Sequence, residues 1–378
     1  MEAVRQGGTQ RAVARRFGIS VRTVQYWVQR AGTQRLDRVD WGDHRHTGHA
    51  APNRTPATRE DAILELRRVL QRTSLLGEYG AQAIQAGLQA QGRPAPAIRT
   101  IGRILARRGV LDARRRQRRP APPPGWYLPA VARRECELDL FDVVEDLKLA
   151  GGPLLDVLTG ISLHGGLPAA WPLVGASTTA IRPCLEAHWQ RHGCPGFAQF
   201  DNDTRFQGPH QHRDVVGRVS RQCLQLGITP VFVPPRELGM QNPIEQFNGL
   251  FQAKVWRRFS FPSPQAVACH SARYVAALGA RRAARIAAAP PRQPWPTGWA
   301  YTPTLVPPGR LIYLRRTNER GEVTLLGRRW PMDRHWLHRL VRIELDLGQG
   351  DLRTYALRRS APADQPLLNQ RPYQPRMR

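Results

Sequence analysis

The sequence predicts a multidomain protein with an all-α amino-terminal part, a central α/β core on a mixed sheet, and a small β-barrel near the carboxyl end. Three patterns predict this class. Apolar residues recur at helical spacing up to residue 110, strand-like runs surround a helical run between residues 135 and 261, and short alternating runs follow residue 309. A chain of 378 residues also exceeds what one compact core usually holds. We place the domains at 1–35, 58–119, 135–290 and 305–359, with a disordered tail at 360–378.

The composition indicates a polyanionic partner. Lys and Arg number 57 against 29 Asp and Glu, which gives a formal net charge of +28, and nucleic acid is the simplest partner for such a chain. The 5 cysteines contain no Cys-x-x-Cys pair, which suits a reducing cytosol and argues against a thiolate zinc site. No apolar run reaches membrane-spanning length, so we expect a soluble, cytoplasmic protein without a membrane partner.

The first 35 residues resemble a helix-turn-helix. Two helical runs, Thr9–Phe17 and Val21–Val28, flank Gly18 at the turn and Ser20 as an N-cap. The apolar residues expected to close the small core are Ala12, Val13, Phe17, Ile19, Val24 and Trp27. If the second helix enters the major groove of DNA, its groove-facing residues include Arg22, Gln25 and Tyr26. The alternative is a helical hairpin with an ordinary charged face.

A second helical module is predicted between Thr58 and Val110. A polar linker at 33–57 precedes it; this linker carries three histidines, His44, His46 and His49, to which we assign no metal role because no cysteine or acid stands at ligand spacing. The module has three amphipathic segments and is similar to the Tyr-Gly-x-x-x-Ile and Thr-Ile-x-Arg-Ile-Leu pattern of insertion-sequence transposases. Its groove-facing candidates are Arg99, Thr100 and Arg103.

An arginine run follows this module. The seven arginines between Arg107 and Arg119 include Arg114, Arg115 and Arg116, and they lead into the Pro-rich segment 120–124. Such a run is often only a solvated surface. Placed before a polyproline spacer between domains, it favours contact with DNA phosphates, which adds affinity without sequence information.

The central core contains two acid-bearing motifs. Phe197 and Phe200 lead into Asp201, as if a buried strand ended by presenting a carboxylate. A Pro-rich loop then gives way to a helix that carries Glu245 on its first turn and Asn248 on the same face. Acids at a strand end and a helix start, in a basic chain, indicate a site for Mg²⁺ or Mn²⁺ that acts on a phosphodiester.

The order of elements around these acids is typical of a ribonuclease-H-like core. Strands are expected at 135–144, at 153–163 and around 169–174, followed by a helix at 177–192 and a strand at 197–200. Asp142, Phe-Asp-Asn-Asp-Thr-Arg-Phe with Asp201, and Gln-Asn-Pro-Ile-Glu-Gln-Phe-Asn with Glu245 resemble the three blocks of the DDE integrase and transposase catalytic core. The resemblance covers residues 135–261.

The resemblance implies a DNA-joining enzyme that uses two Mg²⁺ (or Mn²⁺) ions. Asp142 would bridge both ions, Asp201 and Glu245 would each hold one, and Asn202 and Asn248 would orient ligands or phosphate. Water would release a 3′-OH at the end of an insertion sequence, and that 3′-OH would attack double-stranded target DNA. A homo-oligomer is also implied, since two ends are joined in one event. The alternatives are a non-catalytic DNA-binding regulator and a metal-dependent nuclease.

Two acids compete for the first position. Aligning Glu137-Leu138 with the Glu-Leu that opens the family strand places Asp142 at the aspartate and favours it over Asp139. The sequence departs from the family at Asp203, where glycine is usual; this residue is either a turn residue or an additional acid near the metals. An insertion near 209–216 also lengthens the interval between Asp201 and Glu245.

Basic residues follow Glu245 along its helix. Lys254, Arg257 and Arg258 are either grips on the DNA backbone or an exposed helix face. After a linker with Pro-Trp-Pro, the segment 305–359 resembles the small carboxy-terminal barrel of integrases and transposases, which binds DNA or bridges subunits; a stabilising appendage is the alternative.

Overall fold

The computed structural model describes residues 1–42, 55–74, 78–111, 124–149, 152–208, 213–234, 237, 239–333 and 336–373. Contacts between Cα atoms divide the chain into two compact units, Met1–Asp61 and Ala62–Arg378. The three linker histidines and Arg114, Arg115 and Arg116 lie outside the described residues. Among the described residues, no helix combines the length and apolar character needed to cross a bilayer.

The first unit contains the expected pair of helices. They are α2 (Gln10–Phe17) and α3 (Val21–Ala31), preceded by α1 (Glu2–Arg5). The Thr9 and Ser20 side chains cap α2 and α3, and Gly18 turns the chain in the left-handed region at φ 64°.

The core of this unit differs from the prediction. Val13, Ala14 and Val24 form it, whereas Phe17 and Ile19 are 59% and 45% exposed. Ala3 and Val4, on and beside the short α1, pack against this cluster. Trp27 packs against Trp41, with ring centroids 5.6 Å apart. The small core is therefore completed by the segment before the predicted helices.

The second helical module forms as predicted. Its helices are α4 (Ala57–Thr73), α5 (Ala81–Ala90) and α6 (Ile98–Arg107). They share a buried cluster built from the apolar stripes of the sequence: Ile63, Leu66, Ile84, Leu88, Ile101, Ile104 and Leu105.

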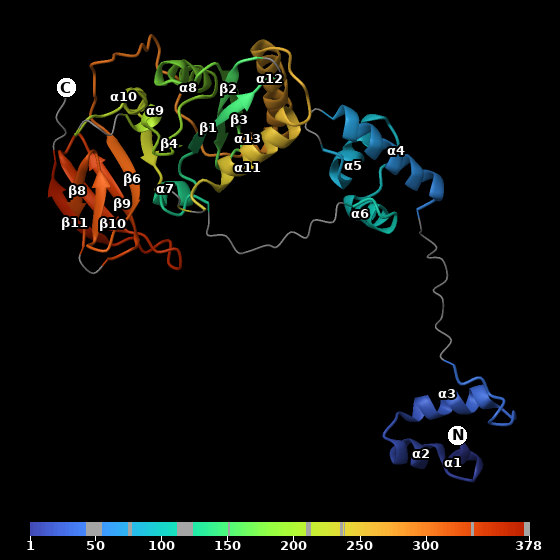
Figure 1. Ribbon diagram of the computed structural model, residues 1–378. Coiled ribbons are helices and arrows are strands. Elements are labelled where there is room, and N and C mark those ends of the chain that lie inside the picture. The colour runs from blue at the N-terminus through green and yellow to red at the C-terminus, as the bar shows by residue number, and fades with distance from the viewer. Residues whose placement is uncertain are drawn as a thin grey trace. The chain divides into compact units, whose positions relative to one another are not determined.

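The central sheet is mixed, as expected. Strand β1 (Leu138–Lys148) pairs antiparallel with β2 (Leu154–Ser162), which pairs antiparallel with β3 (Pro168–Leu173). On the other side of β1, strands β4 (Phe197–Phe200) and β5 (Thr229–Phe232) run parallel to it. The helices of this region, some seen beside the sheet in Figure 1, are α7 (Pro129–Ala132), α8 (Thr178–His192), α9 (Thr204–Gln207), α10 (Arg218–Gln225), α11 (Asn242–Phe251), the π-helix η1 (Gln252–Trp256), α12 (Pro264–Arg281) and α13 (Ala283–Ala287).

Each face of the sheet has its own apolar core. Phe141 and Leu158 belong to the cluster that includes residues of α8 and α10. Leu138, Leu140 and Val144 belong to the cluster that includes residues of α11 and α12. Alternation along β1 therefore sends odd-numbered residues toward α8 and even-numbered residues toward α11.

The carboxy-terminal strands do not form the predicted closed barrel among the described residues. Strand β6 (Arg310–Arg316) pairs parallel with β5, and β9 (Leu340–Asp346), β10 (Asp351–Ala356) and β11 (Leu367–Pro372) continue the same sheet. Its order is β11-β10-β9-β6-β5-β4-β1-β2-β3. Only β7 (Glu322–Leu325) and β8 (Arg328–Pro331) form a separate hairpin. The physical reason is that β6 uses one edge to pair with β5, so it cannot also close a barrel (Figure 1).

The tail expected to be disordered is partly ordered. Strand β11 pairs antiparallel with β10, and the Tyr373 hydroxyl donates a hydrogen bond to Asp214 at 2.6 Å. Tyr373 is buried. Pairing and burial outweigh the polar composition that favoured disorder in residues 367–373.

Candidate active site

Asp142 lies on the sheet face that α11 covers. Asn248 of α11 donates a hydrogen bond from its amide nitrogen to Asp142 Oδ2 at 2.7 Å. The Thr159 hydroxyl, on the neighbouring strand β2, lies 2.6 Å from Asn248 Oδ1 and 3.1 Å from the Asp142 carbonyl oxygen. Thr159 thus orients the amide of Asn248, which in turn orients the carboxylate of Asp142.

Asp201 stands directly after β4, at the carboxyl end of that strand. Its Oδ1 accepts a hydrogen bond from the Asp203 amide at 3.0 Å. The Asn202 side chain donates to the Val233 carbonyl oxygen, which ties the end of β4 to the end of β5. Because β4 runs parallel to β1, Asp201 emerges from the strand next to the one that carries Asp142.

Asp203 is a capping residue. Its carboxylate accepts a hydrogen bond from the Arg205 backbone amide at 2.7 Å at the start of α9. The Arg205 guanidinium binds the same carboxylate and also contacts Glu145 at 2.6 Å. The Asp203 carboxylate is therefore already engaged by a cap and an ion pair.

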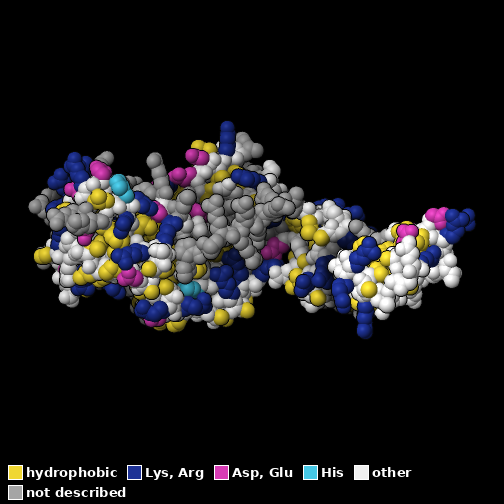
Figure 2. Space-filling view, turned by 90° about the horizontal axis from the view of Figure 1, so that it is seen from below, with side chains coloured by type: hydrophobic (Ala, Val, Ile, Leu, Met, Phe, Trp, Pro, Cys, Tyr) yellow, Lys and Arg dark blue, Asp and Glu magenta, His cyan; other side chains and the backbone are white. Residues whose placement is uncertain are grey.

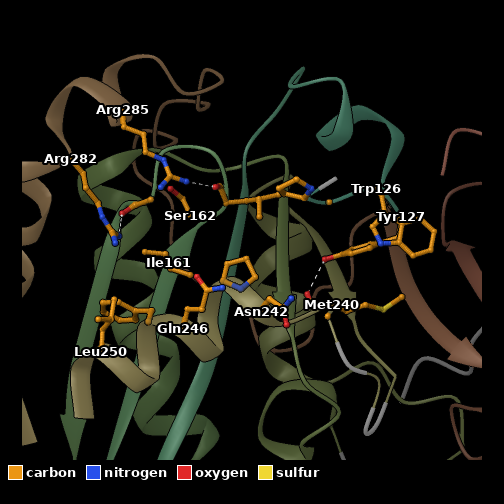
Figure 3. A pocket seen from close by; sticks show the side chains of 17 residues that line it. Trp126, Tyr127, Ile161, Ser162, Met240, Asn242, Gln246, Leu250, Arg282 and Arg285 are labelled. Atoms are coloured by element: carbon orange, nitrogen blue, oxygen red, sulfur yellow. Dashed lines mark hydrogen bonds between the residues drawn. The ribbon is translucent and has the colours of Figure 1, made fainter. Parts of the chain in front are cut away.

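Glu245 is exposed on the first turn of α11, after Pro243. A buried network fixes the start of this helix relative to β4. The Gln199 side chain, two residues before Asp201, donates to the Met240 carbonyl oxygen at 3.0 Å and accepts from the Tyr127 hydroxyl at 2.5 Å. Tyr127 also contacts the Met240 carbonyl oxygen, as the dashed line in Figure 3 shows. The strand bearing Asp201 and the helix bearing Glu245 are thereby joined.

A cavity of 310 Å³ lies on the flank of α11, and Figure 3 shows side chains that line it. Asn242 and Gln246 of that helix line it, together with Trp126, Tyr127 and Arg285. Asp142, Asp201 and Glu245 are not among its lining residues. This cavity adjoins the helix of the site and is separate from the carboxylates.

The pKa of Asp142 responds to burial and to the other two predicted acids. Burial raises the pKa of Asp142 to about 6, and the charges of Asp201 and Glu245 act in the same direction, against the hydrogen bonds from Val143 and Asn248. Burial also raises the pKa of Asp201, against the hydrogen bond from the Asp203 amide, and the charges of Asp203 and Glu145 add to the increase while that of Arg205 opposes it. Asp142, Asp201 and Glu245 are thus brought into one electrostatic neighbourhood from a strand, a strand end and a helix.

The carboxylates do not form a preassembled metal site among the described residues. Among the described residues, no group of three His, Cys, Asp or Glu side chains is close enough to hold a metal ion as it stands. A bound cation would offset the repulsion from Asp201 and Glu245 that helps to raise the pKa of Asp142. Carboxylate oxygens are also the ligands that suit Mg²⁺ or Mn²⁺. The donor set therefore fits a hard divalent cation.

Substituting Asp142 is expected to stabilise the metal-free protein in a pH-dependent way. The pKa of this acid rises from 3.8 to about 6 on folding, so the folded state holds its proton more tightly and the group lowers stability as pH increases through this interval. Asp142→Asn removes a penalty of about 3 kcal/mol above pH 6 and little below pH 4. Urea unfolding of both proteins in EDTA at pH 4 and pH 7.5 measures it; an equal difference at the two pH values contradicts the prediction.

Asp139, the competing acid, faces α8. Arg292 contacts its two oxygens at 2.5 and 3.0 Å, and Trp189 Nε1 donates to it at 3.2 Å. Burial alone raises the pKa of Asp139, but Arg292 and His188 outweigh it and hold the pKa far below its usual range. The Asp139 carboxylate is thus the buried partner of an arginine, on the sheet face opposite Asn248.

The predicted DNA-contacting residues fall into three groups. Arg22, Gln25 and Tyr26 are exposed along α3, and Tyr26 accepts a hydrogen bond from Arg30 at 3.0 Å. On α6, Arg99 and Arg103 are exposed and Thr100 is half-buried. Figure 2 shows Lys and Arg side chains in several groups over the visible face, with fewer Asp and Glu.

The third group, Lys254, Arg257 and Arg258, lies beyond α11, and two of its members contact other residues of the chain. Arg258 donates to the carbonyl oxygens of Gln71 and Arg72 at 3.0 and 2.9 Å, where it caps the carboxyl end of α4. Lys254 lies over the Tyr79 ring at 5.4 Å, and Arg257 is exposed. Arg258 is therefore engaged at the end of α4 in this structure, and its contact with DNA stays a prediction.

The sequence reasoning missed three positioning residues. Thr159, Gln199 and Tyr127 carry the hydrogen bonds that hold the acids in place. The only signal for Thr159 and Gln199 is a polar residue within an otherwise apolar strand. Such a pattern marks a buried polar side chain that needs a partner, but it does not identify the partner.

Comparisons with known proteins place a domain at the amino end. A family model described as a helix-turn-helix domain matches residues 1–39, which confirms that prediction. Three solved structures are similar over larger parts of the chain. A simian T-cell lymphotropic virus intasome in complex with PP2A regulatory subunit B56 gamma is 13% identical, with 68% of this chain and 87% of that chain covered and a TM-score of 0.35.

The other two are single catalytic core domains. The BIV integrase catalytic core is 16% identical, with 38% of this chain and 82% of that chain covered and a TM-score of 0.28. The HTLV-2 integrase catalytic core domain in complex with magnesium is 11% identical, with 43% and 90% covered and a TM-score of 0.29.

Proposed function

We propose that this protein is a DNA transposase or integrase that hydrolyses a phosphodiester at a DNA end and transfers the resulting 3′-OH to target DNA. The observation that carries the proposal is the raised pKa of Asp142, on which burial and the charges of Asp201 and Glu245, delivered from two other elements, act in the same direction. The pKa of a solvated surface acid is not raised in this way, whereas that of an acid in a site that accumulates carboxylates for a cation is.

Asp142, Asp201 and Glu245 would hold one or two Mg²⁺ or Mn²⁺ ions. When bound, such ions activate the attacking oxygen and stabilise the leaving oxygen of an in-line displacement. Asn248 keeps one Asp142 oxygen directed by its 2.7 Å hydrogen bond. Asn202, whose side chain is tied to Val233, acts as a positioning residue for the end of β4.

The helical modules supply the DNA contacts of the proposal. The helix-turn-helix at residues 1–39 is a fold that places its second helix in the major groove, and Arg22, Gln25 and Tyr26 are exposed on that helix. Arg99 and Arg103 on α6 would form a second contact. The excess of basic residues adds sequence-independent attraction to phosphates. Oligomerisation follows if two DNA ends are joined in one event.

The proposal is tested by a joining assay on the full-length protein. Labelled oligonucleotides from the terminal inverted repeats of the element are incubated with plasmid DNA and Mn²⁺ or EDTA. We expect cleaved ends and joined products with Mn²⁺ and neither with EDTA. Cleavage without joining in Mn²⁺ would instead indicate a nuclease. Tight DNA binding without either product would indicate a non-catalytic regulator.

A further inference from the structure

A groove of 530 Å³ opens between the end of β4 and the carboxy-terminal strands. Its lining residues include Asn202 and Gln207, near the end of β4, and Arg315, Arg316 and Asn318 from the carboxy-terminal strands. Asn202 follows Asp201 directly in the chain. The groove therefore begins one residue from the candidate active site and exists because β6 joins the central sheet beside β5.

Arg315 is a buried cation on the wall of this groove. Arg315 is 8% exposed. Its Nη1 donates hydrogen bonds to the carbonyl oxygens of Leu314 and Phe232 at 2.8 and 3.3 Å. None of the ion pairs formed among the described residues involves Arg315, although the neighbouring Arg316 binds Glu237 at 2.7 Å. Burial lowers the pKa of Arg315 to about 10, and only the Tyr313 ring system opposes that change. A buried guanidinium without a carboxylate is costly unless an anion completes it.

Gln207 provides a second, independent sign of a ligand. It is buried at 6% exposure, and its Oε1 has no hydrogen-bond partner among the described residues. The oxygen and nitrogen of a side-chain amide are interchangeable by a flip, so Gln207 can present either an acceptor or an N–H donor to the groove. An amide with an unpartnered atom and a guanidinium without an acidic partner, lining the same groove, suit an oxygen-rich anion.

The acidic residues in and near the groove are engaged by other side chains. Glu322 also lines it, but its carboxylate lies 3.3 Å from the Asn318 amide nitrogen, and its backbone amide is held by Asn318 Oδ1. Glu237, near the rim, is shared by Arg316 and Arg359. The one cation of the lining without an acidic partner among the described residues is therefore Arg315.

We propose that this groove binds a phosphate of the DNA strand that leaves the active site past Asp201, with Arg315 and Gln207 as its ligands. The inference rests on the proposed function for the identity of the strand. It deepens that function by assigning the carboxy-terminal strands a subsite for the DNA backbone, one that follows from the extended sheet and that a separate barrel would not form.

The test measures binding of a labelled random-sequence DNA duplex with a single-stranded overhang to the full-length protein in EDTA. The variant Arg315→Gln removes the positive charge and keeps an N–H donor for the Phe232 carbonyl oxygen. The variant Gln207→Glu adds a negative charge to the lining of the groove. The matched control is Arg353→Gln on β10, which makes the same change of one unit in net charge outside the groove. We expect about a tenfold loss of affinity in both groove variants relative to the control, and a salt-dependence slope that is smaller by about 1 in Arg315→Gln.

A second measurement separates a ligand-binding arginine from a structural one. Without ligand, Arg315→Gln is expected to melt at or above the wild-type temperature, because it removes an unpaired buried charge. Inorganic tripolyphosphate should raise the Tm of wild type and Arg353→Gln more than that of Arg315→Gln. Unchanged DNA affinity in both groove variants overturns the proposal. This holds even if tripolyphosphate raises the Tm of wild type more than that of Arg315→Gln, because binding of free phosphate does not show that a DNA strand lies in the groove. Binding in EDTA is independent of catalysis, so failure of the joining assay leaves this result intact.

Discussion

Asp201→Asn and Glu245→Gln are each expected to lower DNA joining by about a hundredfold to a thousandfold while DNA affinity stays within about twofold of wild type. Each substitution keeps the shape of the side chain and removes one negative charge from the neighbourhood in which Asp142 has a raised pKa. Loss of a cation ligand would weaken the stabilisation of the transition state, whereas the helices proposed to contact DNA lie elsewhere in the chain.

The control for this prediction is Glu319→Gln, which changes the charge equally on an exposed turn. It should join DNA at the wild-type rate. Circular dichroism and the Tm of each variant show that the fold is retained. Wild-type joining by both Asp201→Asn and Glu245→Gln would remove these residues from the active site.

Asp139→Asn and Arg292→Met are each expected to destabilise the fold by about 3–5 kcal/mol, measured by urea unfolding at pH 7. Arg292 and Asp139 form a buried ion pair at 2.5 Å, so removing either partner leaves an uncompensated charge. The pair also fixes the segment that leads from α13 to β6, where Gln293 forms a β-bridge with Cys194. Loss of the pair therefore loosens the path between the two halves of the sheet.

The double variant Asp139→Asn/Arg292→Met provides the control. It removes both charges and is expected to lose less stability than the sum of the two single losses. The pH dependence has a defined sign: the lowered pKa of Asp139 means that its contribution is present above the pKa of the unfolded chain and is lost as pH falls toward the folded value. If Asp139→Asn keeps the wild-type stability but abolishes joining, Asp139 replaces Asp142 as the first ligand.

Local patterns were sufficient to predict the helices and several strands. The predicted strand at 197–200 coincides with β4, and the predicted helix at 177–192 differs from α8 by one residue. These segments carry their own signals, namely an apolar run before Asp201 and an N-cap at Ser177. The choice of Asp142 over Asp139 came from a family pattern.

Alternation in β1 supplies the physical reason for that choice, because residues three apart face opposite sides of a strand. However, the face of β1 that α11 covers depends on tertiary packing, which local sequence patterns do not predict. Asn248 on α11 supports the choice of Asp142, because it reaches that residue from 106 positions along the chain.

Other features depended on long-range pairing and were mispredicted. Short alternating strands fit a closed barrel and an extended sheet equally well, and only the pairing of β5 with β6 distinguishes them. The hydrogen bonds of Arg258 to the open carbonyl groups at the end of α4 are likewise long-range and could not be foreseen from the sequence, while its contact with DNA stays a prediction. Phe17 and Ile19 had helical core spacing, but residues 3 and 4 lie beside the same small core.

The central claim is that Asp142, Asp201 and Glu245 share a divalent cation, and Mn²⁺ binding to the full-length protein tests it most directly. Electron paramagnetic resonance titration at pH 7.5 compares wild type with Asp142→Asn, Asp201→Asn, Glu245→Gln and the control Glu319→Gln. The account predicts a wild-type site that the control retains and that each of the three acid variants weakens by about tenfold or more. Equal Mn²⁺ affinity in wild type and all three acid variants would contradict it.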